Sequence, residues 1–99
     1  MNVGFTPEAN LQADDLDDWW REHRPKARDL FARELAETLE RIAGAPDIGV
    51  EYQTRSGIPC RRVLMQKTRT HVYFEVDRAR DLVTILAVWG APRGRGPGV

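Results

Sequence analysis

Apolar side chains recur at helical spacing early in the chain. Ala9, Ala13, Leu16 and Trp20 form one stripe, which predicts an amphipathic helix. Arg24-Pro25 should end this helix, because the residue before a proline disfavours the helical region. Aspartates fall mainly off the stripe, so the helix should present an acidic face to solvent.

A second apolar stripe predicts another helix, from about residue 25 to residue 43. The stripe consists of Leu30, Phe31, Leu35, Leu39 and Ile42. We assign Glu34 and Glu37 to its solvated face and Gly44 to its C-cap. Two helices in immediate succession predict a helical hairpin.

From residue 50 the pattern of apolar and polar residues has a period of two, which is typical of β-strands. It predicts strands over about 60–66, 71–76 and 82–89, with shorter extended segments at 2–5 and 50–52. Helices followed by a run of strands indicate an α+β fold. We therefore expect an N-terminal short strand and a helical hairpin packed on a small antiparallel sheet of three to four strands.

Side chains alternate between the two faces of a strand. In the middle strand this places Val72, Phe74 and Val76 on one face, where the helices can cover them. His71, Tyr73 and Glu75 then share the other face, which we expect to be open. Arg61 and Arg62 must also point to opposite faces, but the pattern does not fix which of them lies with Tyr73.

The 99 residues fit a single domain, 1–99, with residues 90–99 as a tail rich in glycine, proline and arginine. No apolar run is long enough to span a membrane, and the N-terminus lacks the pattern of a secretion signal. Cys60 is the only cysteine, which excludes an internal disulfide and suits a reducing cytosol. We therefore expect a cytoplasmic protein.

The net charge of zero conceals an asymmetry. Residues 1–49 carry 11 acidic and 6 basic side chains, whereas residues 50–99 carry 4 acidic and 9 basic ones. One interpretation is that the second half meets a polyanion or an acidic protein. The other is that the two halves attract each other on folding.

Candidate metal ligands are sparse. His23, His71 and Cys60 do not have the spacing of a zinc site, so we expect neither a metal nor a cofactor. Cys60 has no neighbouring base in sequence and is expected to be an unreactive thiol.

Six segments, together with the order of the elements, carry a resemblance. They are residues 5–9, 19–25, 45–49, 62–64, 71–77 and 85–93. In this order they resemble the RelE/ParE superfamily of toxins from type II toxin–antitoxin modules, over nearly the whole chain. The resemblance implies a cytoplasmic toxin that inhibits growth when free and is held inactive by a cognate antitoxin in a hetero-oligomer.

The superfamily offers two targets, because its RelE arm cleaves messenger RNA on the ribosome and its ParE arm poisons DNA gyrase. Metal-free RNA cleavage needs a base, an acid and cations that stabilise the phosphorane. If this chain is a nuclease, the resemblance points to Arg62, His71 and Arg93. Arg61 or Arg62 would occupy the first basic position of the family, and Arg93 resembles the arginine after the last strand. His71 departs from the pattern, because it stands where the RelE arm has an arginine before the apolar strand. However, no tyrosine or histidine follows Tyr73, although RelE-like nucleases resemble one another in having one near the C-terminus. The chain therefore resembles the ParE arm more closely, and an enzymatic activity is left open.

Binding to a target or to an antitoxin is predicted for the basic and aromatic residues of the second half. These residues are Arg61, Arg62, Tyr73, Trp89, Arg93 and Arg95. Purely structural roles also remain open. Arg61 and Arg62 could form surface ion pairs with Glu51 or Glu75, and Arg93 and Arg95 could belong to a solvated coil. A third possibility is an inactive family member that only binds its antitoxin.

Overall fold

The computed structural model describes residues 1–90 and 96–98. Its elements are β1 (Asn2–Phe5), α1 (Pro7–His23), the 3₁₀-helix η1 (Pro25–Ala27), α2 (Leu30–Gly44), β2 (Val50–Gln53), β3 (Pro59–Met65), β4 (Thr70–Asp77) and β5 (Leu82–Gly90). This confirms the α+β class and the expected order of helices and strands. Both short extended segments of the prediction are strands, so the sheet has five strands rather than three to four.

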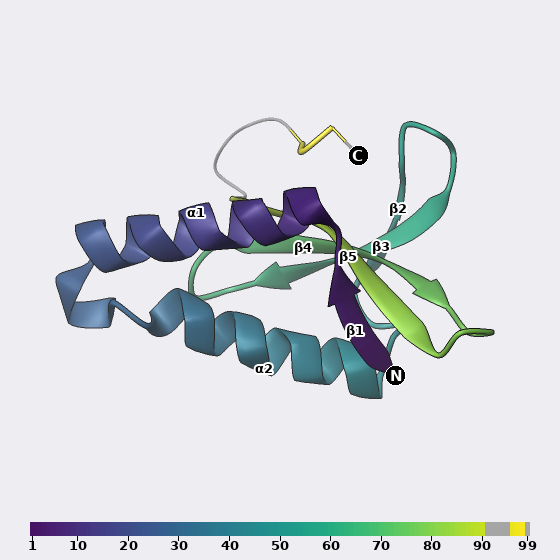
Figure 1. Cartoon of the computed structure of the whole chain (residues 1–99), viewed down its shortest axis with the longest axis horizontal. Helices are drawn as coiled ribbons and strands as arrows, with labels where there is room; N and C mark the ends of the chain where they lie inside the picture. Colours follow the sequence, from purple (N-terminus) through teal and green to yellow (C-terminus); the bar gives the residue numbers. More distant parts are fainter. Residues whose placement is uncertain (91–95, 99) are drawn as a thin grey trace.

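The strands lie in the order β1-β5-β4-β3-β2 (Figure 1). The expectation of an antiparallel sheet was wrong in one respect, because β1 runs parallel to β5. The two helices and three strands lie between β1 and β5 in sequence, which leaves ample chain for the crossover that a parallel pair requires. The remaining pairs are antiparallel.

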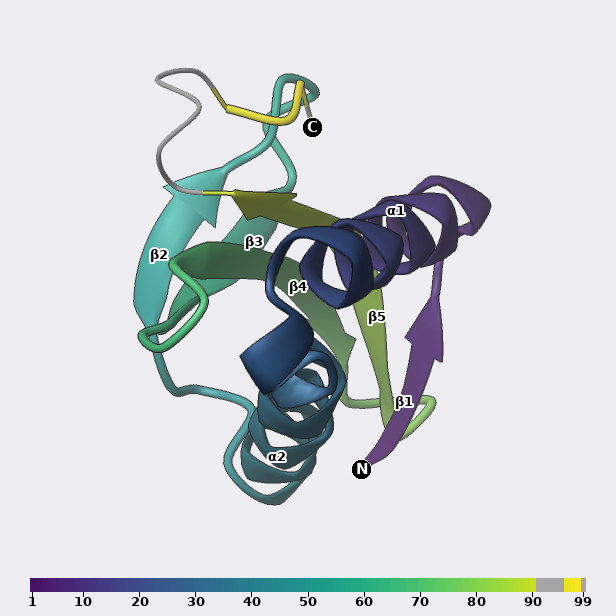
Figure 2. The same cartoon turned by 90° about the vertical axis from the view of Figure 1, so that its left-hand side faces the viewer.

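The two helices and one face of the sheet share a single core, around which the sheet curves (Figure 2). α1 contributes Ala9 and Ala13, and α2 contributes Phe31 and Ile42. The strands contribute Val63, Met65, Val72, Phe74, Val83, Ile85 and Val88. The apolar stripes of both helices thus lie where their spacing predicted, and the opposite face of the sheet is left without helices.

The helix ends follow the prediction only in part. Thr6 caps α1, since its hydroxyl oxygen accepts a hydrogen bond from the Ala9 N–H at 3.1 Å. The second helix does not begin at residue 25, where the chain instead forms the short η1 turn. Gly44 is the last residue of α2 rather than its C-cap, because the Ala45 N–H still bonds to the Arg41 carbonyl and closes the final turn.

A β-bulge at Leu86 shapes the most apolar strand. Tyr73 pairs with Ala87 and Phe74 pairs with Ile85, so Leu86 has no partner in β4. The extra residue reverses the alternation, which brings Ile85 and Val88 to the same buried face. Gln12 of α1 accepts a hydrogen bond from the Val88 N–H at 2.9 Å, so the helix satisfies a backbone donor beside the bulge.

Candidate functional site

Four of the predicted site residues are on the face of the sheet opposite the helices. Residues paired directly across neighbouring strands point to the same face. Arg62 pairs with Tyr73, and His71 pairs with Trp89. These four residues therefore share one surface, as the alternation predicted for His71 and Tyr73. We call it the open face.

An aromatic and cationic cluster occupies the centre of the open face. The guanidinium carbon of Arg62 lies 5.6 Å from the centre of the Tyr52 ring and 6.0 Å from that of Tyr73. The two tyrosine rings pack edge to face at 5.0 Å, and the His71 ring lies 6.1 Å from Tyr73. Two aromatic faces thus hold the Arg62 cation, and among the described residues no carboxylate pairs with it.

Tyr73 is only 2% exposed although it belongs to the open face, so its ring forms the floor of the cluster. Tyr52 was not among the predicted site residues. It reaches the cluster because β2 pairs with β3 in the register that places Tyr52 opposite Cys60. The alternation of Val50, Glu51 and Tyr52 was the only sequence signal that could have indicated this position. A strand of four residues is too short for that pattern to show which face Tyr52 lies on.

The pKa of His71 lies below its usual value of 6.5. Burial is the main cause, followed by the positive charges of Arg62 and Arg69. Imidazole is therefore neutral at pH 7, and a neutral imidazole can accept a proton. The cluster combines a fixed cation with a proton acceptor.

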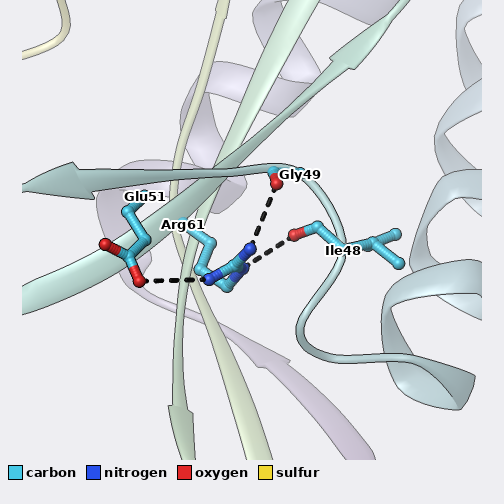
Figure 3. A network of polar contacts seen from close by, with 4 residues as sticks. All are labelled: Ile48, Gly49, Glu51 and Arg61. Atoms are coloured by element: carbon cyan, nitrogen blue, oxygen red, sulfur yellow. Dashed lines mark hydrogen bonds and ion pairs between the residues drawn. The ribbon is translucent and has the colours of Figure 1, made fainter.

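Arg61 points to the other side of the sheet, where its guanidinium binds the connection between α2 and β2 (Figure 3). It donates hydrogen bonds to the carbonyl oxygens of Ile48 at 2.9 Å and Gly49 at 3.1 Å. It also forms an ion pair with Glu51 at 3.9 Å, but Glu51 is 91% exposed, so that pair contributes little stability. Internal partners therefore occupy Arg61, whereas Arg62 presents its charge on the open face.

Gly49 is required at this junction. Its φ is +81°, and a Cβ there would collide with the Arg62 carbonyl oxygen. Any other residue would push the connection away from β3 and disturb the carbonyl groups that Arg61 binds.

The remaining predicted residues lie near the end of β5. Trp89 is half-buried opposite His71. Arg93 and Arg95 lie outside the described residues, so their roles stay predictions. The described part of the tail passes the cluster, since a Cβ on Gly96 would contact the Tyr52 hydroxyl at 3.4 Å.

Glu34 was wrongly assigned to the solvated face of α2. Its carboxylate accepts hydrogen bonds from the backbone N–H groups of Lys67 and Thr68, both at 2.9 Å, and from the Thr68 hydroxyl at 2.8 Å. Glu34 thereby anchors the β3–β4 turn to α2. Because His71 follows this turn closely, Glu34 also helps to position the open face.

Within residues 1–90 and 96–98, no group of three or more histidine, cysteine, aspartate or glutamate side chains is placed to hold a metal ion. Burial, followed by the charge of Glu75, raises the pKa of the Cys60 thiol, so the thiolate is scarce at neutral pH. In the same described part of the chain, no helix is long and apolar enough to cross a membrane.

Comparisons with known proteins agree with this architecture. The family model described as "ParE toxin of type II toxin-antitoxin system, parDE" matches residues 3–93. No curated protein matches the sequence. Among solved structures, the chromosomal ParDE toxin–antitoxin system from P. aeruginosa is similar with a TM-score of 0.67 at 16% identity, over 91% of this chain and 95% of that one.

The isolated E. coli RelE toxin is also similar, with a TM-score of 0.60 at 19% identity, over 95% of this chain and 87% of that one. At these identities the two structures support the shared fold and not a shared activity. The family model covers almost all of the chain and therefore carries the assignment of the family.

Proposed function

The chain belongs to the ParE toxin family of type II toxin–antitoxin systems, and we propose that it inhibits growth by poisoning DNA gyrase when free of its antitoxin. It would do so through protein contacts, without chemistry of its own. The observation that carries this proposal is the match of the ParE family model over residues 3–93. The absence of any tyrosine or histidine after Tyr73 in the sequence supports it, because the C-terminal acid or base of RelE-like nucleases has no counterpart.

The open face is the surface we assign to target contact. Arg62 offers a positive charge that two tyrosine rings hold in place and that no described carboxylate neutralises. Trp89 lies on the same face, opposite His71, and the combination of arginine, tyrosine and tryptophan is typical of interface hot spots. Arg93 and Arg95 would extend the cationic surface.

The partner that restrains the toxin would be a cognate antitoxin, in a hetero-oligomeric complex in the cytoplasm. An antitoxin segment that covers the open face would keep Arg62 from the target. The alternative of a family member that only binds its antitoxin predicts the same complex but no growth inhibition.

A second candidate activity is ribosome-dependent cleavage of messenger RNA. The observation in its favour is that His71, which has a lowered pKa, shares the open face with Arg62. A neutral imidazole would accept the 2′-hydroxyl proton, and the guanidinium would stabilise the phosphorane. Arg93 would be the third contributor.

The decisive experiment compares both targets with one preparation of antitoxin-free protein. In a plasmid supercoiling reaction, a gyrase poison should accumulate cleaved, linear DNA in a manner that depends on the toxin. In a cell-free translation reaction, the 5′ ends of the messenger RNA are mapped by primer extension. Linear DNA with intact RNA supports gyrase as the target, whereas ribosome-dependent cuts with unaffected gyrase would overturn the proposal in favour of the nuclease.

A matched pair of variants locates the contact surface. Arg62→Ala should lower the activity at least tenfold, whereas Arg33→Ala should leave it unchanged, because Arg33 is exposed on α2 away from the open face. Equal activity of both variants would contradict the assignment of the open face.

A further inference from the structure

The sheet divides at the end distant from the β3–β4 turn. The pairing of β3 with β4 ends at Arg61 opposite Phe74. Beyond that point β4 continues to Asp77 beside β5, while the start of β3 stays paired with β2 alone. Figure 1 shows the β2–β3 hairpin diverging from the end of β4 and β5.

A cleft of about 680 Å³ lies in this fork. Its lining comes from both sides of the division, with Tyr52 and Pro59 from the β2–β3 hairpin and Phe74, Glu75 and Val76 from β4. A second hollow of about 510 Å³ continues it past Ile58, which is 51% exposed. The two hollows share four lining residues, so together they form one extended groove; these are Pro59, Glu75, Val76 and Arg78.

The backbone of β4 is left without a neighbour along this groove. Residues 75–77 pair with β5 on one side and with no strand of the described chain on the other. Pro59 begins β3 beside the fork, and proline has no N–H to donate to a neighbouring strand. The unpaired backbone groups of β4 therefore remain available to an added strand.

The charges of the cleft favour a basic occupant. Asp47, Glu51 and Glu75 contribute carboxylates to its walls. Arg61 is bound to the carbonyl groups of the α2–β2 connection and pairs with Glu51. In the second hollow Arg80 pairs with Asp77, so the exposed Arg78 is the remaining basic residue of the lining, against Asp47 and Glu75. Glu75 is half-buried and, within the described residues, forms neither an ion pair nor a hydrogen bond. A partially desolvated carboxylate of this kind gains most from an incoming cation.

From these observations we propose that the cleft binds an extended segment of a partner protein, which adds to the free edge of β4 and places a lysine or arginine side chain against Glu75. Apolar side chains at alternate positions of that segment pack on Val76, Pro59 and Ile58. This is strand addition to a sheet edge, in which main-chain hydrogen bonds give affinity and alternate side chains give specificity. The inference goes beyond the proposed function, since it holds whether the toxin acts on gyrase or on the ribosome.

The test uses the full chain and a displayed library of random twelve-residue peptides. The peptides selected on the wild-type protein should carry a lysine or arginine flanked by apolar residues at alternate positions. Amide hydrogen exchange of the complex should show added protection over residues 75–77. Glu75→Gln should weaken the selected peptides at least tenfold, and Glu37→Gln, an exposed glutamate of α2, should not.

Thermal unfolding of both variants establishes that each is folded before its affinity is compared. Because Glu75→Gln removes only a charge, a folded variant that binds as tightly as the wild type would overturn the proposal. So would the selection of acidic peptides, protection outside residues 75–77, or a failure to select any peptide. The supercoiling and translation assays test the proposed function separately, so the two proposals can fail independently.

Discussion

Arg61 and Arg62 are neighbours in the sequence, but they belong to opposite faces of the sheet and have different partners. The Arg61 guanidinium is bound to the carbonyl oxygens of Ile48 and Gly49, which fixes the chain between α2 and β2. The Arg62 guanidinium lies over two tyrosine rings and has no described carboxylate beside it. The covered face uses its polar groups to hold the fold, whereas the open face carries a cation that no described carboxylate neutralises.

The same contrast holds for the aromatic residues. Phe74 is fully buried among residues of both helices and the sheet, so its ring stabilises the core. Tyr73, the preceding residue, is nearly as buried but packs against Tyr52, His71 and Arg62 on the open face. Burial alone therefore does not distinguish a core residue from a residue of the open face, whereas the identity of the neighbours does.

The largest effect is expected from damage to the covered face. Phe74→Ala should lower the free energy of unfolding by about 3–5 kcal/mol, because it leaves a cavity in the core that the helices and sheet share. Urea unfolding followed by circular dichroism measures this loss. Leu11→Ala is the matched control, since Leu11 is 64% exposed, and it should change stability little. Comparable losses in both would show that the core is not where the structure places it.

The next effect concerns the anchor between α2 and the β3–β4 turn. Glu34→Ala should destabilise the protein by about 2 kcal/mol, because two backbone donors and one hydroxyl lose a charged acceptor. Amide exchange should accelerate at Lys67 and Thr68 in particular. Glu37→Ala, on the exposed side of the same helix, should leave both quantities near wild type. Unchanged exchange at the turn in Glu34→Ala would refute the anchoring role.

A smaller effect separates the two arginines. Arg61→Ala should cost about 1–2 kcal/mol of stability, because the Ile48 and Gly49 carbonyl groups lose a charged donor. Arg62→Ala should cost less than about 1 kcal/mol, the contribution expected of a surface cation–π contact. Chemical denaturation of both variants provides the comparison. A larger loss for Arg62→Ala would mean that its main role is structural and that the open face is not a free binding surface.

The smallest effect is a pH dependence of stability. The folded-state pKa of His71 lies below the value of 6.5, so the unfolded chain binds a proton more readily than the folded one. The contribution of His71 to stability is therefore fully retained above about pH 6.5 and decreases as the pH falls from there toward the folded-state pKa. Thermal unfolding between pH 7.5 and pH 5 should show a shallower decline in His71→Asn than in the wild type, because proton uptake by residue 71 is then no longer linked to unfolding. Identical slopes would contradict the lowered pKa.

Periodicity predicted much of this protein because it depends on local geometry. All the predicted stripe residues of both helices except Leu30 belong to the core or pack against it. The alternation of Val72, Tyr73 and Phe74 correctly divided β4 into two faces. The family resemblance of the local segments is confirmed by the family model. These features repeat every two or every 3.6 residues, so a single sequence displays them directly.

Tertiary structure decided what depends on contacts between distant segments. Examples are the parallel pairing of β1 with β5 and the β-bulge at Leu86. Two others are the hydrogen bonds from the β3–β4 turn to Glu34 and the position of Arg62 on the open face. The sequence by itself determined which residues are apolar and at what spacing, and thereby the elements and the family. It could not determine the register of the strands or the partner of each polar group, because both are set by the packing of the whole chain. A shift of one residue in register exchanges the two faces of a strand.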